Sequence, residues 1–115
     1  MNQKKYKLVV AIDFDGTLTD PKAVWPNTGA FQQDKLEILR ALFKYPDQVV
    51  PVLWTCRRGK YLREAKRLLK KEGIVFKYVN KSPLGGHPKI IASLYIDDKN
   101  ADWNMLAEKI RTVKN

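Results

Sequence analysis

Short apolar runs alternate along the chain with longer segments in which apolar residues recur every three or four positions. The short runs contain many β-branched and aromatic residues, which is typical of buried strands. They lie at residues 8–12, 49–54, 75–79 and 94–96. The periodic segments predict amphipathic helices at residues 31–44, 60–72 and 102–113. The resulting order, β-α-β-α-β-loop-β-α, favours an α/β fold with a parallel sheet and helices packed on its faces.

Proline and glycine mark where these elements end. Tyr45 precedes Pro46 and is pushed out of the helical region, so the first helix should end there. Gly73 suits the left-handed position that follows a helix. Pro51 is a small objection to a central position for the second strand, because proline cannot donate to a ladder.

Composition excludes several classes of protein. A chain of 115 residues favours one domain over residues 1–115, and Cys56, the single cysteine, cannot form an internal disulfide. No apolar run approaches the roughly 20 residues that a membrane span needs, and residues 1–5 are not followed by a secretory apolar segment. We therefore expect a cytoplasmic protein without a membrane partner.

Positive charge is concentrated in one segment. The net charge is +10, and residues 57–81 contribute +8 of it through ten basic and two acidic residues. Such a block indicates a polyanionic partner such as nucleic acid, although a solubilising helix face explains the charge equally well.

Acidic residues follow two of the predicted strands. Asp13 and Asp15 follow the first strand, and Asp97 and Asp98 follow the fourth. In open parallel sheets ligands bind beyond the carboxyl ends of the strands, so these residues should share one edge. Converging carboxylates need protons or a cation, and oxygen ligands without His or Cys favour Mg²⁺.

The segment Asp13-Phe14-Asp15-Gly16-Thr17-Leu18 resembles the first motif of the haloacid dehalogenase (HAD) superfamily of phosphohydrolases. Thr55, which closes the second strand, resembles the second motif, and Lys89 is the better candidate for the third, with Lys81 as the alternative. Asp97 and Asp98 resemble the fourth motif. The resemblance implies a Rossmann-like open parallel sheet flanked by helices.

The resemblance also implies roles for individual residues. Asp13 would attack phosphorus and form an aspartyl-phosphate, and Asp15 would protonate the leaving oxygen and then activate water. The metal set would be Asp13, Asp15 through its backbone carbonyl, Asp97, and either Asp98 or Asp102, the last of which is favoured as a helix N-cap. Phosphate would be bound by Asp13, Gly16, Thr55, Cys56, Arg57 and Lys89.

Spacing between these motifs leaves no room for a cap domain. Thr55 follows Asp13 by 42 positions and Lys89 follows Thr55 by 34, and both gaps are used by predicted elements. An open site suits a phosphate carried on a nucleotide, a nucleic-acid end or a phosphoprotein. The long loop at residues 19–32 is a candidate lid, whose aromatic residues Trp25 and Phe31 either stack on substrate or, more commonly, pin the loop to the body.

Arg57 and Arg58 precede the second predicted helix, where cations are unfavourable, so we expect an anion beside them. Two other hypotheses remain beside a Mg²⁺-dependent phosphatase. One is a receiver-like domain that carries phospho-aspartate, although the third strand ends in Val79-Asn80-Lys81 without an acceptor carboxylate. The other is a basic nucleic-acid-binding module with a vestigial site. A Cys56–His87 pair is an unfavoured reading, and the sequence leaves the oligomeric state open.

Overall fold

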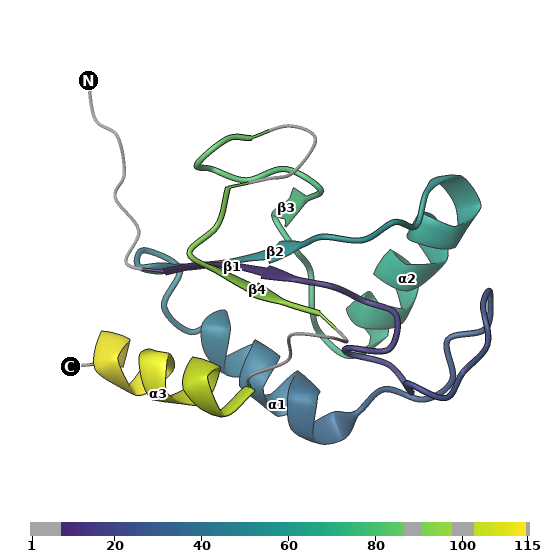
Figure 1. Ribbon diagram of the computed structural model, residues 1–115, viewed down its shortest axis with the longest axis horizontal. Helices are drawn as coiled ribbons and strands as arrows, with labels where there is room; N and C mark the ends of the chain where they lie inside the picture. The colour runs from purple at the N-terminus through teal and green to yellow at the C-terminus, as the bar shows by residue number, and fades with distance from the viewer. Residues whose placement is uncertain (1–7, 87–90, 98–102, 115) are drawn as a thin grey trace.

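The computed structural model describes residues 8–86, 91–97 and 103–114 of the chain (Figure 1). Its strands form one four-stranded parallel sheet in the order β3-β2-β1-β4. They are β1 (Leu8–Ile12), β2 (Val49–Leu53), β3 (Tyr78–Val79) and β4 (Leu94–Ile96). The helices are α1 (Gln33–Leu42), α2 (Gly59–Lys71) and α3 (Trp103–Lys114). The predicted α/β class and element order are confirmed, and each helix begins and ends within two residues of its predicted bounds.

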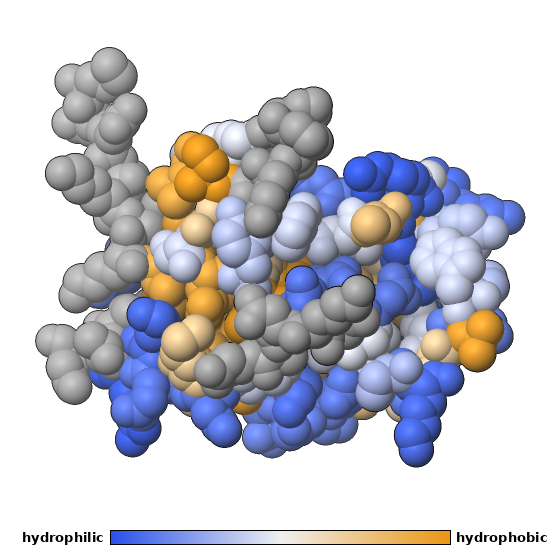
Figure 2. All heavy atoms as spheres, in the orientation of Figure 1, coloured by the Kyte–Doolittle hydropathy of each residue, from blue (hydrophilic) through white to orange (hydrophobic). Residues whose placement is uncertain are grey.

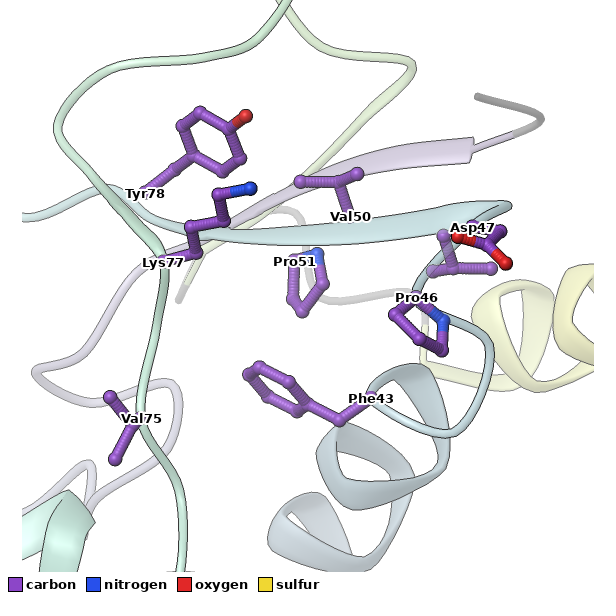
Figure 3. Close-up of a pocket in the computed structure, with 9 residues that line it drawn as sticks. Phe43, Pro46, Asp47, Val50, Pro51, Val75, Lys77 and Tyr78 are labelled. Carbon is purple, nitrogen blue, oxygen red and sulfur yellow. The ribbon is translucent and has the colours of Figure 1, made fainter. Parts of the chain in front are cut away.

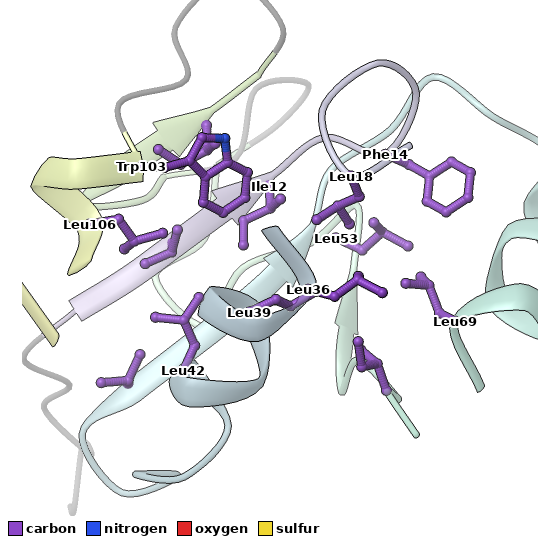
Figure 4. Close-up of a cluster of buried hydrophobic side chains, with 14 of the residues drawn as sticks. Ile12, Phe14, Leu18, Leu36, Leu39, Leu42, Leu53, Leu69, Trp103 and Leu106 are labelled. Carbon is purple, nitrogen blue, oxygen red and sulfur yellow. The ribbon is translucent and has the colours of Figure 1, made fainter. Parts of the chain in front are cut away.

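One face of the sheet carries the main hydrophobic core (Figure 4). Alternate side chains of β1, such as Val10 and Ile12, point to this face, as the two-residue period of a strand requires. All three helices pack against them. Their fully or almost fully buried contributions are Leu36, Leu39 and Leu42 from α1, Ala65 and Leu69 from α2, and Trp103, Leu106 and Ile110 from α3.

The second face of the sheet is covered without a helix in the described part of the chain. A smaller buried cluster lies here, with partly buried aromatic residues around it. The helices predicted to pack on the sheet are present, and in the described residues their buried side chains all lie in the cluster on the first face. The segment that follows β3 runs over this face in Figure 1, and Pro83, Gly85 and Gly86 oppose helix formation within it.

Strand β3 is much shorter than the predicted run at residues 75–79, because pairing with β2 begins only at Val52. Trp54 N–H donates to Ile12 in β1, so by alternation the nitrogen of Pro51 faces the β3 side. That nitrogen carries no hydrogen, and the chain beside it is unpaired. Pro51 is therefore compatible with an interior strand, because the ladder between β2 and β3, which its nitrogen faces, starts one residue later.

The end of α2 fixes the direction in which the chain leaves toward β3. Gly73 has a φ of 75°, and its N–H donates to the Lys70 carbonyl, while the N–H of Ile74 donates to Leu69. These two bonds form a Schellman motif, so the left-handed position predicted for Gly73 is confirmed.

Surface character differs between the two ends of the molecule (Figure 2). Hydrophilic residues cover the lower side, where α1 and α3 lie, and the upper right, whereas most hydrophobic residues on this face gather on the left. None of the three described helices combines the length and the apolar composition that a membrane span requires.

Candidate functional site

The carboxyl edge of the sheet brings the first residues after β1 and β4 together. Asp13 N–H donates to the Ile96 carbonyl over 2.9 Å, which continues the ladder one step beyond the paired residues Ile12 and Ile96. Asp97 follows Ile96 directly, so Asp13 and Asp97 begin the two loops that leave neighbouring strands. This junction is the point where strand order reverses, because β2 and β3 lie on one side of β1 and β4 lies on the other.

A tight turn follows Asp13 and positions Asp15. The Phe14 carbonyl accepts from the N–H groups of Leu18 and Thr19, and Gly16 N–H donates to the Thr19 hydroxyl oxygen over 3.0 Å. Gly16 has a φ of 75°, which favours glycine at this position. The Asp13 carboxylate accepts from Phe14 N–H over 2.7 Å. The local sequence thus fixes the backbone that carries both carboxylates.

Asp15 forms a two-pronged ion pair with Arg57. The Nε and Nη2 groups of Arg57 donate to Oδ2 and Oδ1 of Asp15, each over 2.7 Å. The Arg57 side chain is completely buried, whereas 36% of the Asp15 side chain is exposed. The anion expected beside Arg57 is therefore at least in part this carboxylate of the same chain, 42 positions earlier.

Arg57 is also enclosed by aromatic rings and backbone carbonyls. Its guanidinium carbon lies 5.1 Å from the ring centre of Phe14 and 4.8 Å from that of Trp25. Nη1 donates to the Tyr61 carbonyl over 3.2 Å, and Nη2 donates to the Pro26 carbonyl over 3.3 Å. Arg57 thereby links the turn after β1, the loop after it and the first turn of α2.

Thr55 is buried at the end of β2 and is held from two sides. Its N–H donates to Oδ1 of Asn80 over 2.8 Å, and its hydroxyl oxygen accepts from Arg57 N–H over 3.1 Å. Asn80 in turn donates its own N–H to the Leu53 carbonyl over 2.7 Å. A hydroxyl that accepts through one lone pair retains its proton for donation to another oxygen, such as one of a phosphoryl group.

Asn80 is a site residue that sequence reasoning did not select. Its φ of 55° places it in the left-handed region, which asparagine tolerates better than most residues. An asparagine directly after a predicted strand that itself ends at the candidate edge is the signal that could have found it.

The other residues considered for the site lie at several places in the chain. Gly16 lies in the turn beside Asp15, and Cys56 is exposed next to Thr55. The side chain of Arg57 is committed to Asp15, so only its backbone faces Thr55. The other lysine candidate, Lys81, is exposed just after Asn80. Lys89, with His87, Asp98 and Asp102, lies outside the described residues.

The described residues supply part of an oxygen-ligand set. No group of three or more acidic, His or Cys side chains suited to a metal is present within residues 8–86, 91–97 and 103–114. Asp13 and Asp97 bring carboxylates to one junction, and both carboxylate oxygens of Asp15 face Arg57, which leaves its backbone carbonyl as the potential ligand. Such oxygen donors suit a hard divalent cation.

Two hollows of the surface bear on the position of the site. One of about 190 Å³ lies directly beside Asp15, between Gly16 and the loop that contains Trp25. A larger one of about 250 Å³ lies near the start of β2, lined by Pro51, Val75 and neighbouring residues (Figure 3). This larger hollow is at the opposite end of β2 from Thr55, so its size does not make it the candidate site.

Both aromatic residues of the 19–32 loop contact the body of the protein. Phe31 packs edge-on against Phe14 with ring centres 5.9 Å apart, and Trp25 packs against Tyr61 at 5.1 Å. The base of the loop is closed by the side chain of Gln32, whose Nε2 donates to the carbonyls of Thr17 and Thr19. These contacts support the expectation that the aromatic residues pin the loop.

The order of the strands and the placement of the helices define the structural class of the protein. The chain is an α/β protein with a Rossmann-like open parallel sheet flanked by three helices. Among solved structures it is similar to a conserved protein from Bacteroides thetaiotaomicron, with a TM-score of 0.76 and 30% sequence identity. The match covers 94% of this chain and 93% of the other, so the chain belongs to the same family as that conserved protein. No model of a protein family and no curated protein matches the chain.

Proposed function

We propose that the protein is a Mg²⁺-dependent phosphatase of the capless HAD type that hydrolyses phosphate monoesters. The observation that carries this proposal is the meeting of Asp13 and Asp97 at the strand-order switch, with Thr55 at the end of the next strand. A nucleophilic carboxylate, a second carboxylate and a buried hydroxyl at one edge are the groups that phosphoryl transfer through an aspartyl-phosphate requires.

Each described residue has a defined part in the proposed reaction. A carboxylate oxygen of Asp13 attacks phosphorus while the bond from phosphorus to the ester oxygen breaks. Asp15 gives a proton to that leaving oxygen, and afterwards takes one from the water that hydrolyses the aspartyl-phosphate. Thr55 donates its hydroxyl proton to a phosphoryl oxygen. A bound Mg²⁺ would offset negative charge on the phosphoryl group, held by Asp13, Asp97 and the Asp15 carbonyl.

Surface features favour a large, anionic substrate. Arg63, Lys66, Arg67 and Lys70 are exposed along α2 at helical spacing, so they share one face of the helix. Like charges at this spacing destabilise a helix by roughly 0.2–0.5 kcal/mol per pair, which a bound polyanion would reverse. Nucleotides and nucleic-acid ends are the substrates of this chemistry that we favour.

Hydrolysis of an aryl phosphate tests the reaction, and a panel of phosphorylated nucleotides, sugars, peptides and oligonucleotide ends tests the substrate. We expect Mg²⁺-dependent release of phosphate that Asp13→Asn abolishes, and trapping of phosphate on the wild-type chain alone. Full activity in Asp13→Asn would refute the nucleophile assignment. A phospho-aspartate that persists for minutes would instead indicate a receiver, and salt-sensitive nucleic-acid binding without hydrolysis would indicate a binding module.

A further inference from the structure

We infer that Arg57 is a positioning residue that acts through Asp15, rather than a ligand for the substrate phosphate. This inference rests on the proposed phosphatase function and assigns a task to the one completely buried arginine of the described site. The alternative is the assignment suggested by its place after Thr55, namely direct contact with phosphate.

Burial and hydrogen bonding argue for the positioning role. No part of the Arg57 side chain is exposed, and its guanidinium is bounded by Phe14 and Trp25. Nε and both terminal nitrogens already donate within the protein, to Asp15, Pro26 and Tyr61. A phosphate in solvent would have to displace these partners and the rings to reach it.

The pair leaves Asp15 able to exchange protons with a substrate. A carboxylate has about four lone-pair sites, and the two hydrogen bonds from Arg57 occupy one on each oxygen. The side chain is 36% exposed and lines the hollow of about 190 Å³. The two hydrogen bonds from Arg57 fix the plane of the Asp15 carboxylate. The remaining lone pairs of Asp15 therefore keep a constant direction. Asp15 would first take up a proton from solvent on one of these lone pairs, and an ester oxygen positioned in that direction would receive that proton from a group that is already oriented.

Lysine could not replace this function fully. The planar guanidinium matches both carboxylate oxygens at once, whereas an ammonium group is a point charge on a flexible stem. Arg57→Lys should therefore retain the charge and lose the fixed plane.

The test compares two esters in a single turnover with wild type, Arg57→Met and Arg57→Lys. Proton donation matters for an alkyl phosphate, whose leaving group is a strong base, and little for 4-nitrophenyl phosphate. We expect Arg57→Met to slow cleavage of the alkyl ester about 30-fold and of the nitrophenyl ester less than about threefold. Arg57→Lys should slow cleavage of the alkyl ester less than Arg57→Met does. Inorganic phosphate should inhibit all three proteins with similar inhibition constants.

Two further variants separate this role from a general effect on folding. Arg40→Met removes a different arginine–carboxylate pair, with Glu72 at 3.0 Å, and should leave the ratio of the two rates unchanged. In an Asp15→Asn background, Arg57→Met should cause no further loss in cleavage of the alkyl ester, because the two residues act as a unit. Equal slowing of both esters, or a large rise in the phosphate inhibition constant, would overturn the inference while the phosphatase activity itself stood. A wild-type protein without hydrolysis would instead refute the proposed function.

Discussion

The backbone N–H of Thr55 donates to the side-chain oxygen of Asn80 over 2.8 Å, which ties the end of β2 to the residue that follows β3. Asn80 also pairs through its own N–H with Leu53, so one residue closes the ladder and orients the next turn. Because Thr55 is buried, an N–H without this acceptor would lie away from water. The shortest strand of the sheet is thus reinforced by a side chain at the point where it supports the candidate site.

Replacement of Asn80 should lower the free energy of unfolding. The loss should depend on whether the new residue lacks only the side-chain acceptor or also fits the left-handed backbone angle poorly. Asn80→Ala loses the acceptor and places a less suitable residue at a φ of 55°, so we expect a loss of about 2 kcal/mol in the free energy of unfolding. Asn80→Gly loses the acceptor but accepts the backbone angle, and should lie between Ala and wild type. Urea denaturation measures both. Equal stability of all three proteins would show that the hydrogen bond contributes nothing.

The sequence predicted the elements well because their signals are local. Short apolar runs and three- to four-residue periodicity depend only on neighbours, and they located β1, β2, β4 and all three helices. Pairing between distant residues has no such signal. Charge before α2 predicts an anion near Arg57, yet nothing local identifies Asp15, 42 positions earlier, as its partner. The length of β3 likewise depended on the missing N–H of Pro51 on the adjacent strand.

The loop at residues 19–32 should be sensitive to a single methyl group at Gly29. Its φ is 67°, and a Cβ added there would lie 2.8 Å from the Cβ of Asp20. Gly29→Ala therefore combines an unfavourable backbone angle with a close contact, and we expect a loss of about 2–3 kcal/mol. Gly73→Ala is the matched control, because its φ is 75° and the added Cβ would meet no described residue beyond its chain neighbours within 4 Å, so it should cost only about 1 kcal/mol. Chemical denaturation of the two variants measures the difference, and equal losses would mean that the loop yields to the contact.

Two buried threonines in the turn after Asp15 should respond in opposite ways to the same substitution. The hydroxyl of Thr17 is buried and has no hydrogen-bond partner among the described residues, so Thr17→Val should leave stability unchanged or raise it by up to about 1 kcal/mol. The hydroxyl of Thr19 accepts from Gly16 and donates to Phe14, so Thr19→Val should cost about 1–2 kcal/mol. Thermal unfolding of both variants is the measurement. A marked loss in Thr17→Val would reveal a partner for that hydroxyl.

Removal of the divalent cation should stop the proposed reaction reversibly. We expect EDTA to abolish hydrolysis and added Mg²⁺ to restore it, because Asp13 and Asp97 offer oxygen ligands at one junction. Asp97→Asn weakens one of these ligands and should raise the Mg²⁺ concentration for half-maximal activity about tenfold or more. Glu37→Gln, an exposed change on α1, serves as the control for net charge. Undiminished activity in EDTA would exclude a dependence on the cation.

The basic face of α2 should matter only when the substrate extends beyond its phosphate. Arg63, Arg67 and Lys70 are exposed on one side of the helix and are not part of the proposed chemistry. Reversal of these three charges to Glu changes the net charge from +10 to +4, so an extended polyanion such as a phosphorylated oligonucleotide should bind more weakly. We expect the KM of the oligonucleotide to rise at least about tenfold at low salt. This KM should also vary much less with salt concentration than it does for the wild-type protein. The KM for 4-nitrophenyl phosphate should change little, because that ester does not reach along the helix. If the KM of the oligonucleotide also stayed constant, the charge on α2 would be a solvated face with no part in substrate binding.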